Sequence, residues 1–180
     1  FPQRRAALLG QLKDGVVILF GDAAAPPGAH FRQDNDLFYL TGCDDLGAIL
    51  VLVPSTKGAY LFLPQLTARE KQYDGPNLLD DPEAKAKGGY TDVYPSSYLD
   101  EFLSRWSARP GGVFHLRLSQ RDSLDEARSE TGLMEGRRAR SHYYDQLSAD
   151  RYRIVKLRER YPQMEFRDVT PAIDALRAIK

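Results

Sequence analysis

The sequence predicts a three-layer α/β domain in which helices flank a mixed β-sheet. Four short apolar runs are continuous rather than alternating with polar residues, which is typical of strands covered by helices on both faces. Stretches with helical spacing alternate with these runs along the chain. Only the segment "STKG" (55–58) lies between "AILVLVP" (48–54) and "AYLFLP" (59–64), so the second and third runs are predicted to pair as an antiparallel hairpin. A hairpin among crossover connections makes the sheet mixed.

The elements follow one another in a regular order. Strands are predicted at "VVILF" (16–20), "AILVLV" (48–53), "YLFL" (60–63) and "VFHL" (113–116). Helices are predicted at 3–12, 82–87, 95–106, 121–134, 150–161 and 168–180. The clearest helix is 95–106, because one face carries apolar residues at helical spacing, namely Leu99, Phe102, Leu103 and Trp106. The last helix reaches Lys180 with no glycine or asparagine to end it, so we expect a further segment in the parent protein.

Length and charge exclude several classes of protein. The 180 residues fit one domain, and 25 Lys and Arg balance 25 Asp and Glu. Proteins that bind nucleic acid or a membrane surface normally carry a basic excess, so neither partner is expected. There is no apolar run of membrane-spanning length, and the residues at the start of the sequence do not resemble a signal peptide. A single cysteine, Cys43, favours the cytoplasm, although a processed secreted protein would also begin without methionine, as this chain does at Phe1.

Residues that carry chemistry are scarce in this chain. The three histidines have no paired metal-binding spacing, and His115, inside an apolar strand, is expected to be a hydrogen-bonded structural residue. There is no G-x-S-x-G elbow and no glycine-rich phosphate loop. A calcium loop is excluded because its glycine and final glutamate are missing from the acidic group Asp34, Asp36, Asp44 and Asp45. The sequence therefore predicts no catalytic residue and no metal ligand in these residues.

Two segments nevertheless carry a resemblance to a known family. The run "FRQDNDLFYLTG" (31–42), which leads through a polar turn into a strand, resembles a signature near the start of Xaa-Pro aminopeptidases (aminopeptidase P). The segment "LFLPQLTAREKQYDGPN" (61–77) is similar to a later region of the same family, and both ends of the chain also match. The resemblance implies a creatinase-like N-terminal domain over 1–180 that is not itself catalytic. It also implies a following "pita-bread" domain that holds two divalent metal ions, typically manganese.

The first segment is interpreted as a structural corner. Its signature residues are Arg32, Gln33, Asp36, Tyr39, Thr41 and Gly42. We expect Asp34 or Asn35 to cap the following turn, Phe38 and Leu40 to enter the core, and Gly42 to end the segment with positive φ. Direct contact with substrate is the alternative. In the segment before it, "AAAPPGAH" (23–30), the family often has an aspartate near the substrate's amino end, and that role cannot be transferred here.

The second segment carries the candidate binding residues Tyr73, Asp74 and Gly75. The family usually has Trp-x-Gly there, and the resemblance implies that this aromatic reaches the active site of an adjacent subunit. The Asp-Gly-Pro sequence after Tyr73 predicts an exposed loop that presents the ring. The alternative is a tyrosine that packs this loop onto the domain.

The resemblance implies hydrolase activity for the parent protein, which would remove the N-terminal residue ahead of proline. The expected partners are the protein's own C-terminal catalytic domain, further copies of the chain in a homo-oligomer, and proline-containing peptides. Two alternatives stay open: a domain of a prolidase or creatinase relative, and a catalytically inactive peptide-binding module. The basic and tyrosine-rich stretch at 136–144 fits either a solvated turn or a phosphate contact.

Overall fold

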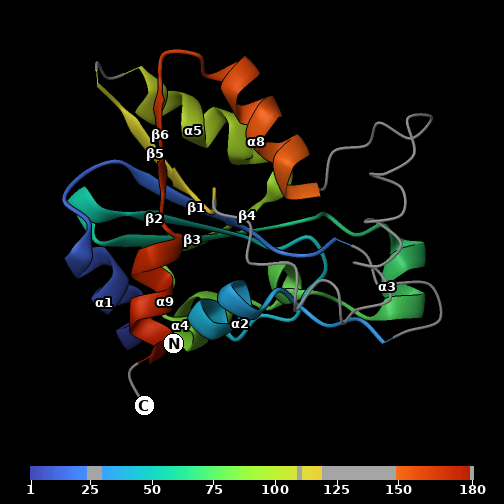
Figure 1. Ribbon diagram of the computed structural model, residues 1–180. Helices are drawn as coiled ribbons and strands as arrows, with labels where there is room; N and C mark the ends of the chain where they lie inside the picture. Colours follow the sequence, from blue (N-terminus) through green and yellow to red (C-terminus); the bar gives the residue numbers. More distant parts are fainter. Residues whose placement is uncertain (24–29, 109–110, 119–148, 179–180) are drawn as a thin grey trace, which may run out of the picture.

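The computed structural model describes residues 1–23, 30–108, 111–118 and 149–178. Within them, six strands form one sheet in the order β4-β3-β2-β1-β5-β6 (Figure 1). The strands are β1 (Val16–Phe20), β2 (Ile49–Val53), β3 (Gly58–Leu63), β4 (Asp92–Pro95), β5 (Val113–Leu116) and β6 (Glu165–Asp168). Four of the six lie on the predicted apolar runs.

The sheet is mixed, as predicted. β1 and β2 are antiparallel, with Val17 opposite Leu52, and β2 and β3 are antiparallel, with Val51 opposite Tyr60. The pairs β1–β5, β3–β4 and β5–β6 are parallel. The predicted hairpin therefore forms, and a short 3₁₀ turn, η1 (Pro54–Thr56), makes its connection.

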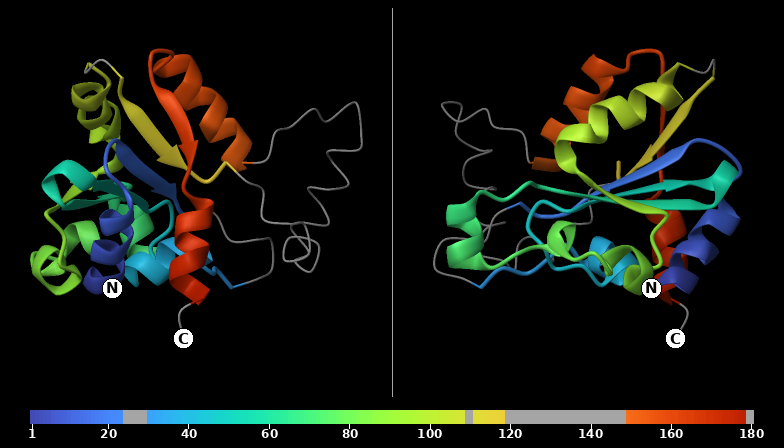
Figure 2. Two further views of the ribbon diagram at one scale, coloured as in Figure 1. Left: turned by 60° about the vertical axis from the view of Figure 1, so that its left-hand side comes forward. Right: turned by 180° about the vertical axis from the view of Figure 1, so that it is seen from behind.

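Helices cover both faces of the sheet and give the three layers (Figure 2). One face carries α5 (Leu99–Ser107) and α8 (Ala149–Arg160). The other carries α1 (Pro2–Gln11), α2 (Asn35–Thr41), α4 (Ala84–Gly88) and α9 (Thr170–Ala178). Helix α3 (Ala68–Asp74) lies at one end of the molecule, and two further 3₁₀ turns are η2 (Leu78–Asp80) and η3 (Ser96–Tyr98). The α/β fold class is thus confirmed.

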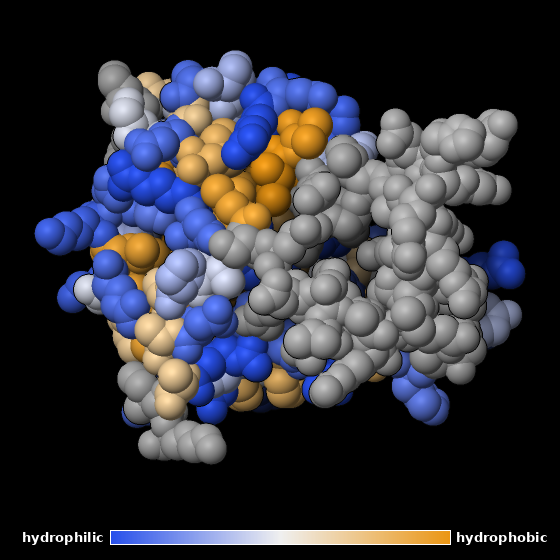
Figure 3. All heavy atoms as spheres, in the orientation of Figure 1, coloured by the Kyte–Doolittle hydropathy of each residue, from blue (hydrophilic) through white to orange (hydrophobic). Residues whose placement is uncertain are grey.

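Each sheet face has its own core, which explains the continuous apolar runs. In β1, Val17 and Leu19 pack on the side of α1, α2 and α9, whereas Val16 and Ile18 pack on the side of α5 and α8. Successive side chains of a strand point to opposite faces, so a strand covered on both faces must be apolar throughout. The visible surface is mainly hydrophilic, and its apolar colour gathers in the upper layer over α8 (Figure 3).

Several predictions of local structure were wrong or incomplete. The edge strands β4 and β6 were not predicted, because neither is an apolar run and their residues are partly or fully exposed. Phe38, which was expected in the core, is 47% exposed. The reason is that the expected turn is a helix, α2, whose buried face carries Leu37 and Thr41 together with Leu40, which is buried as expected. The predicted helix at 121–134 and the basic stretch at 136–144 lie outside the described residues.

Among the described helices, none combines the length and the apolar character that a membrane span requires.

Candidate functional site

The signature segment forms one short helix with a polar beginning and an apolar end. The carboxylate of Asp34 caps α2 by accepting hydrogen bonds from the backbone N–H groups of Asp36 at 3.0 Å and Leu37 at 2.9 Å. Gly42 ends the helix in the left-handed conformation, with φ of 69°. Both expectations about the caps agree with the structure. The charged residues at the start of this segment directly precede its apolar residues because α2 runs from the surface into the core within two turns.

Gln33 holds the entrance to this helix. Its side chain is buried, and its Oε1 accepts hydrogen bonds from the backbone N–H groups of Asp22 at 2.8 Å and Asp34 at 2.9 Å. Its Nε2 donates to the backbone oxygen of Asp45 at 2.7 Å. One amide thus joins the chain after β1, the start of α2 and the loop before β2. A buried amide with these partners is structural rather than reactive.

Asp36 is fully buried and lies at the centre of a cluster of charges. Its Oδ1 is 2.6 Å from Nη1 of Arg177 in α9, and its Oδ2 is 3.4 Å from Nη1 of Arg117, which follows β5. The same Arg117 nitrogen is 2.6 Å from Oδ2 of Asp34. Two carboxylates and two guanidinium groups therefore join α2, α9 and the end of β5. Such a cluster satisfies buried charges that would otherwise be costly.

The other signature residues differ in burial. Tyr39 is partly buried and donates its hydroxyl to the backbone oxygen of Leu176 at 3.2 Å. Thr41 is buried, donates to the oxygen of Leu37 at 2.6 Å and accepts from the N–H of Cys43 at 3.0 Å. Arg32 is exposed, and its Nη2 is 3.3 Å from Oδ1 of Asn35. Arg32 therefore stands apart from the buried members of the signature.

Tyr73 lies on a helix rather than on the expected loop. Thr67 and Glu70 form a capping box at the start of α3: the N–H of Glu70 donates to Thr67 Oγ1 at 3.3 Å, and the N–H of Thr67 donates to Glu70 Oε2 at 2.6 Å. The capping box extends the helix through Tyr73 and Asp74 before Gly75 ends it with φ of 84°. The exposure that the sequence predicted does hold, because Tyr73 is 74% exposed.

The region around α3 is tied to the signature helix by a residue that sequence reasoning missed. Asp45 Oδ2 accepts the N–H of Leu78 at 2.9 Å, while the backbone oxygen of Asp45 accepts from Gln33. Burial raises the pKa of the Asp45 carboxyl above its ordinary value, and the hydrogen bond from Leu78 opposes that shift. The sequence offered no signal that distinguishes Asp45 from its exposed neighbour Asp44.

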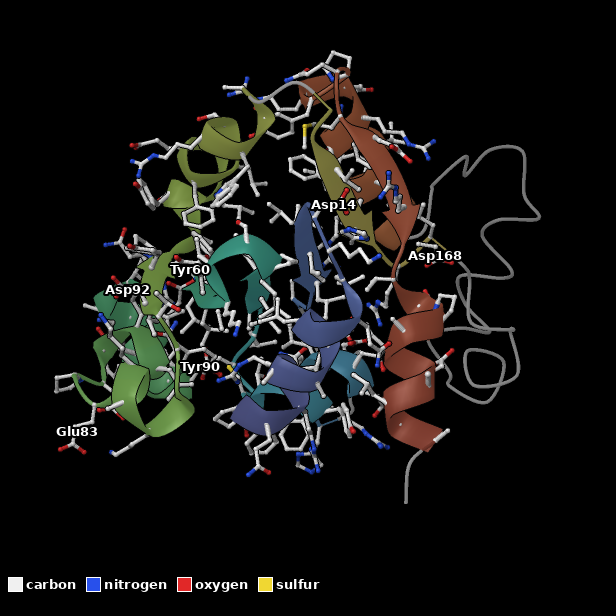
Figure 4. The ribbon with its side chains drawn as sticks, turned by 90° about the vertical axis from the view of Figure 1, so that its left-hand side faces the viewer. Asp14, Tyr60, Glu83, Tyr90, Asp92 and Asp168 are labelled. Carbon is white, nitrogen blue, oxygen red and sulfur yellow. The ribbon has the colours of Figure 1, made fainter. Side chains whose placement is uncertain are left out.

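Within the described residues, no group of three or more His, Cys, Asp and Glu side chains could hold a metal ion. His115 is buried in β5, and its Nε2 lies 3.0 Å from the backbone oxygen of Asp14, as expected for a structural histidine. Figure 4 labels Asp14, which lies just before β1 in the chain. What the described residues do provide is a rigid corner and a separate, outward-facing aromatic ring.

Comparison with known proteins identifies the family. The sequence model of the family described as "Aminopeptidase P, N-terminal domain" matches residues 1–114. The chain belongs to this family.

Solved structures with the same fold include aminopeptidases P from several bacteria. A putative aminopeptidase P from Bacillus anthracis superimposes with a TM-score of 0.70 at 22% identity over 99% of this chain and 39% of the other. Aminopeptidase P from E. coli with the inhibitor Pro-Leu gives 0.64 at 20% identity over 99% and 38%. The proline aminopeptidase P II of Yersinia pestis gives the same values. At such low identity these likenesses show the fold alone.

One curated relative is named as a peptidase. It is the mitochondrial intermediate cleaving peptidase 55 of Arabidopsis thaliana, 34% identical over 85 residues, which are 47% of this chain and 17% of the relative. The aminopeptidase P N-terminal domain described here thus spans much less than half the length of the proteins it matches.

The structure separates the candidate residues of this aminopeptidase P N-terminal domain into two groups. Gln33, Asp36 and Thr41 are buried and bonded inside the corner, whereas Tyr73 and Asp74 are exposed on α3. The two groups are not brought into one pocket. Asp45 links the two groups, because it bonds both to Gln33 and to Leu78, just after α3.

Proposed function

We propose that this chain is the non-catalytic N-terminal domain of a dinuclear metal Xaa-Pro aminopeptidase, which removes the N-terminal residue ahead of proline. The observation that carries the proposal is the family match over residues 1–114. In the parent enzyme the domain contributes to oligomerisation and to substrate access. Its partners are its own C-terminal catalytic domain, further copies of the chain and proline-containing peptides.

The proposed substrate contact is Tyr73, with Asp74 and Gly75 ending the helix that carries it. Support comes from the exposure of the ring, which is 74%, and from the capping box that fixes α3. Arg69, one turn earlier, lies with its guanidinium carbon 5.9 Å from the ring centre and restricts the ring on one side. An aromatic ring on a rigid support offers contact area to a peptide at little entropic cost. We propose that this contact is made to the active site of an adjacent subunit.

The two divalent metal ions, proposed to be manganese, belong to the catalytic domain of the parent enzyme. The described residues do not provide a binding site for these ions, because no three or more ligand side chains cluster among them. No step of the hydrolysis is therefore assigned to a residue of this chain. The cytoplasmic location stays a prediction, and the Arabidopsis relative is named as mitochondrial.

The test is kinetics of the full-length parent enzyme with Tyr73→Ala. We expect kcat/KM for longer proline-containing peptides to fall by about tenfold, a loss typical of one aromatic contact. Tyr73→Phe should retain most of the activity because the ring is kept. Tyr152→Ala is the matched control, since Tyr152 is also exposed, at 54%, but lies on α8.

Thermal unfolding of the 180-residue chain distinguishes function from packing. The Tm of Tyr73→Ala should equal that of the wild type, because an exposed ring contributes little to stability. Unchanged peptide kinetics, or unfolding of the variant, would show that Tyr73 only packs α3. Sequence beyond Lys180 tests the wider proposal: an Asp, Asp, His, Glu, Glu ligand set supports the enzyme, and its absence supports an inactive peptide-binding module.

A further inference from the structure

The edge strand β6 has backbone groups that nothing in the described part of the chain satisfies. It is the outermost strand on its side of the described sheet, next to β5 (Figure 4). The N–H of Glu165 donates to the oxygen of Gly112 at 3.0 Å, and the N–H of Val169 donates to that of Leu116 at 2.9 Å. Because alternate residues of a strand turn their backbone groups to opposite sides, the N–H and C=O of Phe166 point away from β5. Neither group has a hydrogen-bond partner among the described residues.

One acidic and one basic side chain flank Phe166 on the same face of β6. Glu165 and Arg167 are both exposed, and within the chain Nε and Nη2 of Arg167 lie 2.7 and 2.9 Å from the two Glu165 carboxylate oxygens. Nη1 of Arg167 also lies 3.3 Å from Oδ1 of Asp14. Charges on an edge strand normally oppose association of two copies, because they bring like charges together. Opposite charges placed symmetrically about one residue have the reverse effect, because an antiparallel copy then brings Arg167 opposite Glu165.

Antiparallel pairing of two β6 strands about a two-fold axis at Phe166 would satisfy all of these groups. The Phe166 residues of the two copies would form a hydrogen-bonded pair, in which the N–H of each donates to the C=O of the other. On both sides of the axis, Glu165 of one copy would lie opposite Arg167 of the other. These are non-hydrogen-bonded positions, where opposite side chains come closest. The two Phe166 rings would share the other face, where Phe166 already contacts Phe114 edge-on, with 5.9 Å between the ring centres.

We propose that β6 is an interface between two copies of this chain, which pair antiparallel about Phe166 and join their sheets into one. A second copy is favoured over an unrelated acidic or basic peptide, because such a peptide matches only one of the two charges. The contact is small, since β6 has four residues, so we expect a weak dimer with a Kd on the order of 100 µM. The inference rests on the proposed role in oligomerisation, to which it assigns a surface, and not on the peptidase activity.

The experiment is sedimentation equilibrium of the 180-residue chain between about 10 µM and 1 mM at low ionic strength. The average mass of the wild type should rise with concentration from the 20.3 kDa of the monomer toward twice that value. Glu165→Arg gives the edge two basic residues and Arg167→Glu gives it two acidic ones, so like charges meet across the axis in each variant. Each substitution should weaken self-association at least about tenfold.

Mixing the two variants tests the register of the pairing. In an equimolar mixture of Glu165→Arg and Arg167→Glu, opposite charges meet again across the axis, so a heterodimer should form although neither variant associates alone. Recovery in the mixture also shows that both variants are folded. Glu101→Arg is the matched control, because Glu101 is exposed and paired with Arg105 at 2.7 Å but lies on α5, and its dimer should match that of the wild type.

Hydrogen exchange gives a readout at the edge itself. The amide proton of Phe166 should exchange more slowly at 1 mM than at 10 µM protein, because the dimer protects it. The proposal is overturned by a wild type that stays monomeric at 1 mM, by single variants that associate as tightly as the wild type, or by a mixture that stays monomeric. None of these measurements involves the catalytic domain, so such a result would leave the proposed peptidase function of the parent untouched.

Discussion

Gly42 shows how one backbone conformation sets the signature corner. Its φ is 69°, and a side chain added there would collide with the ring of Phe1. We expect Gly42→Val to cost on the order of 1–3 kcal/mol, because a β-branched residue is strained at a left-handed position. Asp44→Ala, two residues later and exposed, should change stability by no more than about 0.5 kcal/mol. Thermal unfolding of both variants measures the difference, and equal Tm values would contradict this account of the corner.

Cys43 predicts a loss of stability in alkaline solution. The thiol is buried, and burial raises its pKa to about 12. The unfolded chain releases this proton near pH 9.0, so between about pH 9 and 12 the folded state holds more protons than the unfolded state. Stability must then fall as pH rises, by about 1–2 kcal/mol between pH 8 and pH 10.

Cys43→Ala removes this group and should flatten the fall between pH 8 and pH 10, as measured by denaturant unfolding at each pH. Tyr90, whose pKa is also raised to about 12 by burial, continues the loss above pH 10 in both proteins. If the free energy of unfolding fell equally with pH in the wild type and in Cys43→Ala, other groups would control alkaline stability.

At the scale of elements, α2 and α9 are held together by the ion pair of Asp36 and Arg177 and by the hydrogen bond from Tyr39 to Leu176. Asp36 is fully buried and 2.6 Å from Arg177, so replacing Arg177 weakens the compensation of a buried carboxylate. We expect Arg177→Gln to destabilise the fold by about 1–3 kcal/mol. In a double-mutant cycle with Asp36→Asn, we expect a coupling energy of about 0.5–3 kcal/mol.

Hydrogen exchange tests where the effect of Arg177→Gln is felt. Amide protons of α9 should exchange faster in Arg177→Gln, because the ion pair with Asp36 holds the last turn of this helix. Those of α8 should not change. Lys156→Gln serves as the control, since its pair with Glu159 is 2.8 Å long but exposed on both sides, and its loss should leave Tm unchanged. If Arg177→Gln and Lys156→Gln lowered Tm equally, burial would not determine how much each ion pair contributes to stability.

Element by element, periodicity predicted the interior better than the edges. The apolar runs predicted the bounds of β1 and β5 correctly, because both faces of these strands are covered. β4 and β6 carry no such run, because an edge strand keeps polar and charged residues in contact with water. The Asp-Gly-Pro sequence after Tyr73 predicts a loop, but the structure has the helix α3 there, which begins at the capping box of Thr67 and Glu70.

At the scale of the whole molecule, the chain is predicted to lack peptidase activity by itself. With manganese added, the purified chain should not hydrolyse Xaa-Pro peptides, because the chemistry is assigned to the catalytic domain of the parent. Calorimetric titration with manganese should show no site tighter than millimolar, because the metal ligands are assigned to the catalytic domain of the parent. Turnover that survives rigorous purification would contradict the division of roles proposed for the two domains.

The sequence by itself determined the layered α/β architecture, the hairpin and the left-handed glycine that ends α2, and it narrowed the cap of that segment to Asp34 or Asn35. Each of these depends on residues close together in the chain, where spacing, capping and turn preferences act directly. Only the tertiary structure decided that Asp36 is buried against Arg117 and Arg177, which are 81 and 141 residues away. It also decided that Phe38 faces solvent and that the Arg5 guanidinium is buried against the carbonyl groups at the ends of α2 and α4. Local patterns cannot report these outcomes, because the burial of a charge depends on which distant partners the fold brings to it.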